Sequence, residues 1–221
     1  MNPQVAWWRE FGDGPTPQRP LLVVAVQDDP VALSALPLDH GATWQQRETP
    51  TSRVAHHLGV PVFVLGSEEL PDDRDLLLLA SVGRGMTTLA ASVAVTHFAA
   101  EPQLVVGYGS GIDDLQWMQK VQDVRSRTHS SVPEPVSQLA HVLQTTRVPV
   151  LLDGVISAAA AALAERLPPV QSPVCGDEPV QRFFLDRCDA GVWGTSGIGP
   201  GEGLGALNGL AMLRLALLAA S

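Results

Sequence analysis

The chain has 221 residues, of which 45% are hydrophobic and 17% are charged, and its formal net charge is −9. A chain of this length and composition can bury a sizeable core, which excludes a wholly disordered protein. Lysine and arginine residues form no cluster in the sequence, and aromatic residues make up only 5% of it. We therefore expect no nucleic-acid partner, because such partners need a basic surface or stacking rings.

Cysteine usage and the N-terminal sequence favour a cytoplasmic location. Cys175 and Cys188 are the only cysteines, and we expect both to be free thiols in a reducing compartment. The first residues include acids and lack the apolar stretch of a signal peptide. The longest apolar run is interrupted by charged residues, so we expect no membrane span. The histidines at positions 56, 57, 97, 129 and 141 show no metal-ligand spacing. We expect neither a metal nor another cofactor.

The N-terminal half of the chain alternates apolar runs with segments of helical character. Residues 1–20 are polar and proline-rich, and we expect an arm or loop there. Strands are predicted within 19–30, 60–66 and 75–82, since each holds a continuous run of Val or Leu that is typical of a strand buried on both faces. Helices are predicted at 51–59 and from residue 86 onward, whereas residues 30–50 show no clear period.

The C-terminal half continues the same alternation. We expect a strand at 104–109, then a helix in which Leu115, Met118, Val121 and Val124 fall three residues apart. A helix, the strand 148–154 and an Ala-rich helix follow, then a weak apolar segment at 190–194 and a last helix over 207–220. This order predicts an α/β fold with a mostly parallel, Rossmann-like sheet flanked by helices, formed by one domain over residues 21–221. Ligands of such sheets bind at the carboxyl ends of the strands.

Small-residue loops at those strand ends are the candidate functional segments. Gly83 and Gly85 permit close backbone approach, and Thr87 is a candidate helix cap, although an ordinary strand-to-helix turn explains them equally. Asp153 stands at the end of an apolar strand. Three roles are open for it: a helix cap, an acceptor that braces a loop, or a ligand to a sugar hydroxyl. Glu202 is a single acid among glycines, where an apolar pocket would raise its pKa toward the range of a general base.

Four segments resemble, in the same order, motifs of the nicotinate-nucleotide:dimethylbenzimidazole phosphoribosyltransferase family. They are GRGMTTLAASVAV, GYGSGIDDLQWMQKV, VPVLLDGVISAAAAALAERL and GPGEGLGALNGLAMLRLA. The resemblance covers roughly residues 20–220 and implies transfer of phosphoribose from nicotinate mononucleotide to a benzimidazole-type base, with Glu202 as the general base. It also implies a homodimer, an apolar C-terminal helix that serves either the core or an interface, and substrate-binding residues Gly83, Gly85, Thr87, Lys120, Asp153, Gly199, Gly201 and Gly203.

The chain departs from the family's pattern at several of these positions. Ser81 stands where the family commonly has an acid, Met86 where it has Asn, and Pro200 and Leu204 where it has Leu and a small hydroxyl residue. The early Asp-His-Gly motif is replaced by residues 28–30. These changes leave a second hypothesis open, in which the protein is a non-catalytic homologue that binds a nucleotide or base, or serves as a partner subunit.

Overall fold

A computed structural model of the chain describes residues 2–66, 68–109, 111–127, 131–194 and 201–221. Its centre is one sheet of six parallel strands in the order β2-β1-β3-β4-β5-β6. The strands are β1 (Pro20–Val26), β2 (Val62–Val64), β3 (Leu76–Val82), β4 (Val150–Leu152), β5 (Val170–Ser172) and β6 (Gly191–Val192). The predicted α/β fold with a parallel, helix-flanked sheet is confirmed.

The apolar runs of β1 and β3 form two hydrophobic cores, one on each face of the sheet. Side chains of a strand alternate between faces, so Leu21 and Val23 join the first core while Leu22 and Val24 join the second. Both strands are buried along nearly their whole length. The continuous Leu and Val runs therefore reflect a sheet covered on both sides.

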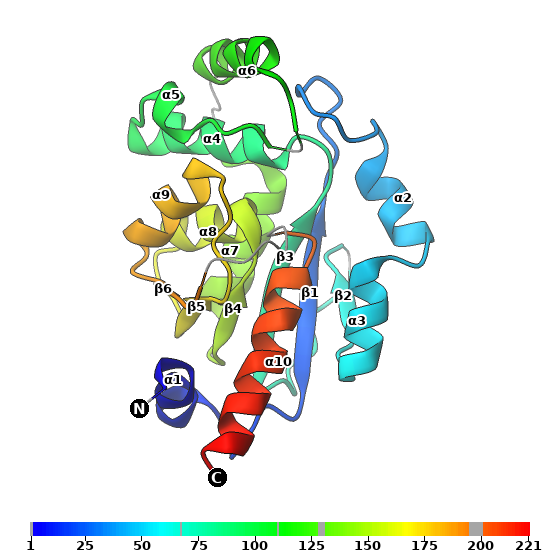
Figure 1. The fold of residues 1–221 in the computed structure, drawn as a ribbon, viewed down its shortest axis with the longest axis vertical. Helices are drawn as coiled ribbons and strands as arrows, with labels where there is room; N and C mark the ends of the chain where they lie inside the picture. Colours follow the sequence, from blue (N-terminus) through cyan, green and yellow to red (C-terminus); the bar gives the residue numbers. More distant parts are fainter. Residues whose placement is uncertain (1, 67, 110, 128–130, 195–200) are drawn as a thin grey trace.

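Helices cover both faces of this sheet (Figure 1). Residues of α4 to α9 contribute to the first core, and residues of α1, α2, α3 and α10 contribute to the second. The helices are α1 (Pro3–Phe11), α2 (His40–Gln46), α3 (Pro50–Leu58), α4 (Met86–Phe98), α5 (Pro102–Val105), α6 (Asp114–Ser126), α7 (Glu134–Thr145), α8 (Gly154–Leu163), α9 (Pro179–Arg187) and α10 (Leu204–Ala219). Among these described helices, none combines the length and the apolar character of a membrane span.

The N-terminal segment is not the arm or loop that its composition suggested. Residues 3–11 form α1, which starts at a proline and is capped by the Asn2 side chain. Trp7 and Trp8 are buried in the second core, and the indole of Trp8 donates a hydrogen bond to the carbonyl of Gly14 at 3.0 Å. Two large buried rings explain why this polar stretch packs against the fold.

One other expectation from a local pattern is wrong. The run at 104–109 does not form a strand, because Pro102 starts the short helix α5, which ends at Val105. The helix predicted to follow this run is confirmed as α6, in which Leu115 and Met118 are exposed, whereas Val121 and Val124 are buried. A helix turns by about 100° per residue, so positions 115 and 124 point in opposite directions. The sequence patterns did not predict α2, β5 or α9.

Candidate active site

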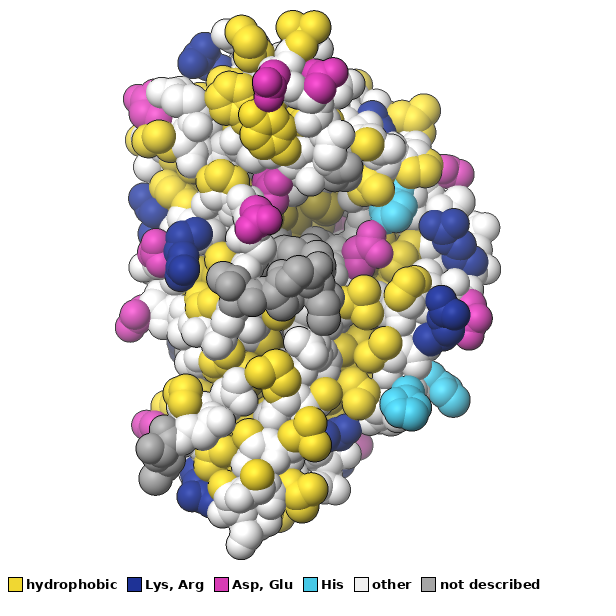
Figure 2. All heavy atoms as spheres, viewed as in Figure 1, with side chains coloured by type: hydrophobic (Ala, Val, Ile, Leu, Met, Phe, Trp, Pro, Cys, Tyr) yellow, Lys and Arg dark blue, Asp and Glu magenta, His cyan; other side chains and the backbone are white. Residues whose placement is uncertain are grey.

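A cleft opens where β1 and β3 end side by side, the point at which the strand order changes direction. Crevices at such positions are the usual ligand sites of open parallel sheets. The cleft has a volume of about 320 Å³, and Figure 2 shows acidic side chains and a histidine near a hollow in this part of the surface. Its lining residues are Ser34, Leu36, Ser81, Gly83, Gly85, Met86, Thr87, Gly109, Val155, Asp177, Glu178, Gly201 and Glu202.

Gly83 allows the loops after β1 and β3 to touch. Its φ is +147°, and a Cβ atom there would lie 1.6 Å from the carbonyl oxygen of Gln27. Only glycine tolerates both the backbone conformation and this approach. Gly83 is one of four glycines in the cleft lining, which also includes apolar side chains such as Met86 and Val155.

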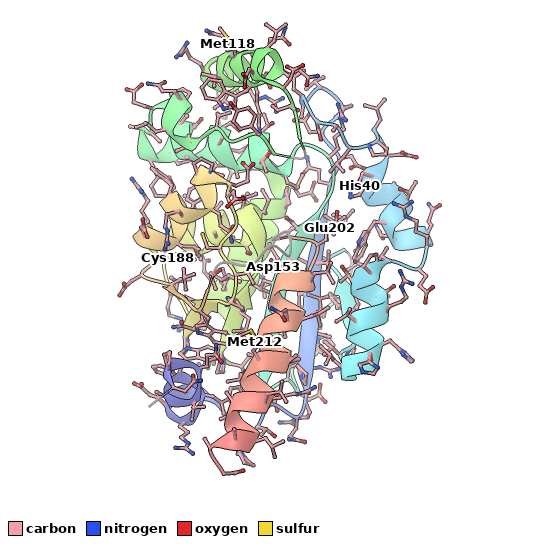
Figure 3. All side chains as sticks on the ribbon, in the orientation of Figure 1. His40, Met118, Asp153, Cys188, Glu202 and Met212 are labelled. Carbon is pink, nitrogen blue, oxygen red and sulfur yellow. The ribbon has the colours of Figure 1, made fainter. Side chains whose placement is uncertain are left out.

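Glu202 projects from the segment just before α10, and 39% of its side chain is exposed. Its φ of +54° lies in the left-handed region, which is unfavourable for a residue with a side chain. Two backbone contacts hold it there: its N–H donates to the carbonyl of Ser81 at 3.2 Å, and its carbonyl accepts from Thr51 Oγ1 at 2.7 Å. Its carboxylate oxygen Oε1 lies 2.6 Å from His40 Nε2, and Figure 3 shows the two side chains close together.

Lys120 lies behind Thr87, a residue of the cleft lining, and is not part of that lining itself. Only 1% of the residue is exposed, and its ammonium donates to Thr87 Oγ1 and to the carbonyl of Gly107, each at 2.9 Å. Burial lowers the pKa of Lys120, while the nearby charge of Glu178 acts in the opposite direction. An ammonium has three donors, so one remains beyond the two contacts made with described residues. Glu178 also accepts the N–H of Gly109 at 2.5 Å.

Asp153 is buried behind the cleft rather than in its lining. It does not cap α8 with its side chain. Its carboxylate accepts the N–H of Gly201 at 2.8 Å and that of Gly205 at 3.0 Å. Burial raises the pKa of Asp153 to about 6, although these backbone hydrogen bonds lower it. Of the three interpretations of this residue, the contacts match the loop-bracing acceptor.

Of the glycines predicted to bind substrate, some line the cleft and one packs against the core. Gly83, Gly85 and Gly201 line the cleft together with Thr87. The N–H of Gly201 is occupied by Asp153. Gly203 precedes α10, and a Cβ atom there would lie 2.8 Å from Leu22, so its place is against the core. Gly199 lies outside the described residues.

His40 was not singled out from the sequence, and neither was the way in which Asp28 holds it in place. The Asp28 carboxylate accepts the N–H of Gly41 at 2.9 Å and that of Arg84 at 2.7 Å, which fixes the start of α2 beside the loop after β3. The stretch 30–50 gave no periodic signal because α2 is short and only partly buried. The sole local signal was Asp39 directly before the helix, a residue type that often begins helices.

Within the part of the chain that the structure describes, no three or more His, Cys, Asp or Glu residues gather as a possible metal site. The charged groups at the cleft are instead carboxylates with one buried amine. Such an arrangement suits proton transfer by a carboxylate and the binding of a small polar molecule through backbone groups.

Comparison with known proteins assigns a family to this fold and cleft. Residues 63–221 match the family model DBI_PRT, which is described as a phosphoribosyltransferase. The chain belongs to this phosphoribosyltransferase family. The matched range includes Gly83, Lys120, Asp153 and Glu202, and the resemblance based on the four motifs is confirmed.

Three relatives carry the name nicotinate-nucleotide–dimethylbenzimidazole phosphoribosyltransferase. The protein of Mycobacterium leprae (strain Br4923) is 34% identical over 177 residues, 70% of this chain and 50% of that protein. The protein of Corynebacterium glutamicum (strain R) is 33% identical over 69% of this chain and 49% of its own length. The Mycobacterium tuberculosis protein is 35% identical over 71% and 50%. The chain thus spans about half the length of the curated relatives it matches.

Two solved structures share the fold. The crystal structure of CobT from Thermus thermophilus has a TM-score of 0.75 and 22% identity, over 90% of this chain and 83% of that chain. A structure of the nicotinate-nucleotide–dimethylbenzimidazole phosphoribosyltransferase from the same organism has a TM-score of 0.74 and 21% identity, over 91% and 82%. At this level of sequence identity, the structural similarity shows a shared fold only.

Proposed function

We propose that the protein transfers phosphoribose from nicotinate mononucleotide to a benzimidazole-type base. One ring nitrogen of the base attacks the anomeric carbon, and the bond from that carbon to the nicotinate nitrogen breaks. The proton on the other ring nitrogen moves to Glu202, which acts as the general base. The names of the curated relatives support these substrates. We assign the reaction to the lower-ligand branch of cobalamin synthesis, as the resemblance to the family implies.

The position of Glu202 is the observation that carries the proposal. It is a partly exposed carboxylate in the lining of a cleft that also contains four glycines. A neutral azole that attacks through one nitrogen must lose a proton from the other, and a carboxylate within hydrogen-bond reach accepts it. The strained φ of Glu202 also fits a functional role, because such backbone conformations concentrate at active sites.

We further propose that Lys120 contacts the phosphate of the donor. Its amine lies next to two residues of the cleft lining, since it donates to Thr87 and a Cβ atom on Gly109 would lie 3.3 Å from it. Gly83, Gly85 and Thr87 would lie beside the base and ribose. Asp153 would act on the substrate through the segment that carries Glu202, because its own oxygens hold Gly201 and Gly205.

A product assay tests this function. The protein is incubated with nicotinate mononucleotide and a panel of azoles, and mass spectrometry detects the ribotide and free nicotinate. We expect product with at least one benzimidazole. Binding of nicotinate mononucleotide by calorimetry without product from any azole would reject catalysis and favour the non-catalytic homologue.

We also propose a homodimer that pairs through the outer side of α10. The inner side of this helix is buried in the second core, while Leu215 is 67% and Leu218 is 72% exposed. Figure 3 shows Met212 on the same helix, and an apolar groove of about 380 Å³ lies between α3 and α10. Sedimentation should give a dimer that Leu215→Glu disrupts and that Leu104→Glu, at an exposed site on α5, does not. A monomeric wild type would reject the proposal.

We retain a cytoplasmic location as part of the proposal. Cys175 and Cys188 are both unpaired in the structure, which supports a reducing compartment.

A further inference from the structure

The contact between His40 and Glu202 joins two distant parts of the chain. His40 is the first residue of α2, whereas Glu202 lies just before α10. The distance of 2.6 Å between Nε2 and Oε1 is that of a short hydrogen bond to a charged group. His40 is buried, while the carboxylate faces the cleft.

Both partners are held at their backbones, so this contact does not depend on two free side chains meeting. Asp28 accepts the N–H groups of Gly41 and Ala42, the two residues after His40. On the other side, Thr51 and Ser81 fix the backbone of Glu202. Hydrogen bonds therefore fix the backbone on both sides of the contact between the imidazole and the carboxylate.

We propose that His40 is a positioning residue for Glu202. This inference rests on the proposed function. The Nε2–H group of His40 donates to Oε1 and directs Oε2 into the cleft, where Oε2 accepts the proton of the azole. Oε2 has no hydrogen-bond partner among the described residues. His40 keeps its own proton throughout, and the proton lost by the azole resides on Glu202 until it passes to water.

The physical need for such a partner follows from the glutamate side chain. A partly exposed glutamate samples several rotamers, and fixing it costs conformational free energy. A donor on Oε1 selects one rotamer and leaves Oε2 available to accept a proton. A displacement of the reacting group by about 1 Å can cost on the order of 100-fold in rate. The gain from His40 should therefore appear in kcat rather than in substrate binding.

Three variants separate this role from a structural one. In His40→Leu the donor is absent, and we expect kcat to fall about 10- to 100-fold with KM for both substrates changed less than about threefold. His40→Gln retains an N–H donor, and we expect it to recover at least about a third of the wild-type kcat. The control is His141→Leu, an exposed histidine on α7, which should behave like the wild type.

A second measurement does not need turnover. In ¹⁵N-histidine spectra, assigned by loss of the signal in His40→Gln, Nε2 of His40 should appear protonated at neutral pH, and Glu202→Gln should shift it. If the wild type makes no product with any azole, the proposed function fails, while this spectrum still tests the hydrogen bond. An unprotonated Nε2, or a wild-type kcat in folded His40→Leu, would overturn the role of His40.

Discussion

The carboxylate of Asp153 accepts the N–H of Gly201 at 2.8 Å, which ties the end of β4 to the residue before Glu202. The second carboxylate oxygen holds Gly205 in the first turn of α10 at 3.0 Å. One buried acid therefore braces both sides of the strained backbone at position 202. Burial disfavours its ionised form and raises its pKa to about 6, so this brace is costly to the fold.

Replacing Asp153 with asparagine should separate stability from activity. The amide has one acceptor oxygen, so one of the two backbone donors loses its partner, and we expect turnover to fall at least about tenfold. Stability at pH 7 should change little, because removal of the buried charge offsets the loss of one backbone hydrogen bond. Asp75→Asn is the matched control, since Asp75 also accepts two backbone N–H groups, from Gln18 and Arg19, far from the cleft. It should lower stability and retain turnover; unchanged turnover in Asp153→Asn would contradict the bracing role.

The pH dependence of stability provides a further check on the same variant. Because the pKa of Asp153 is raised to about 6 in the folded protein, the folded state binds this proton more tightly than the unfolded chain. The contribution of Asp153 is therefore largest below pH ~4 and is lost as the pH rises through about 6, by about 3 kcal/mol in all. Urea denaturation of the wild type should show this loss relative to Asp153→Asn. A wild type that becomes more stable relative to Asp153→Asn as the pH rises would contradict the raised pKa.

Gly83→Ala should be strongly destabilising. The new Cβ would lie 1.6 Å from the Gln27 carbonyl at a φ of +147°, which separates the loops after β1 and β3. We expect the free energy of unfolding to fall by more than about 3 kcal/mol, as measured by urea denaturation. Gly66→Ala is the control, since no atom lies within 4 Å of its Cβ position. Equal effects of the two changes would refute this account of the loop contact.

Lys120→Met should weaken donor binding. Methionine retains most of the apolar stem but removes the charge and the donors, so KM for nicotinate mononucleotide should rise at least about tenfold while the fold persists. Thr87→Val keeps the amine and removes one of its acceptors, and we expect a smaller rise. Steady-state kinetics over a range of donor concentrations measure both. An unchanged KM in Lys120→Met would remove the phosphate role of this residue.

Trp8→Ala should show that the N-terminal helix is part of the core. The Trp8 ring is fully buried, and removing it should cost about 3–5 kcal/mol of unfolding free energy. Phe11→Ala, at an exposed position on the same helix, should change stability by less than about 1 kcal/mol. Thermal or urea denaturation compares the two. A small loss in Trp8→Ala would mean that α1 is peripheral after all.

Long apolar runs predicted the central elements well. The buried strands β1 and β3 and the helices α4, α8 and α10 lie where Val, Leu and Ala runs indicate them, because burial on both sides leaves a strong pattern. Short or locally ambiguous segments were harder. The strand-like run after Pro102 became part of a helix, since a proline at its first position favours that start.

The sequence predicted the loops of the candidate site but not the hydrogen bonds that connect them. Gly83 and Glu202 can be recognised from the sequence alone, because a glycine-rich loop and an isolated acid among glycines are local patterns. The contact of His40 with Glu202 joins residues from opposite ends of the chain, and no local pattern encodes it. The same holds for Asp153, whose partners lie in a different loop.

The most direct test of the account is the rate at which Glu202→Gln forms ribotide from nicotinate mononucleotide and dimethylbenzimidazole, compared with the wild type under saturating substrates. Glutamine matches the size of glutamate but cannot accept the proton, so we expect at least an about 100-fold loss of rate in a variant that is folded and still binds the donor. A rate within about threefold of the wild type would show that Glu202 is not the general base.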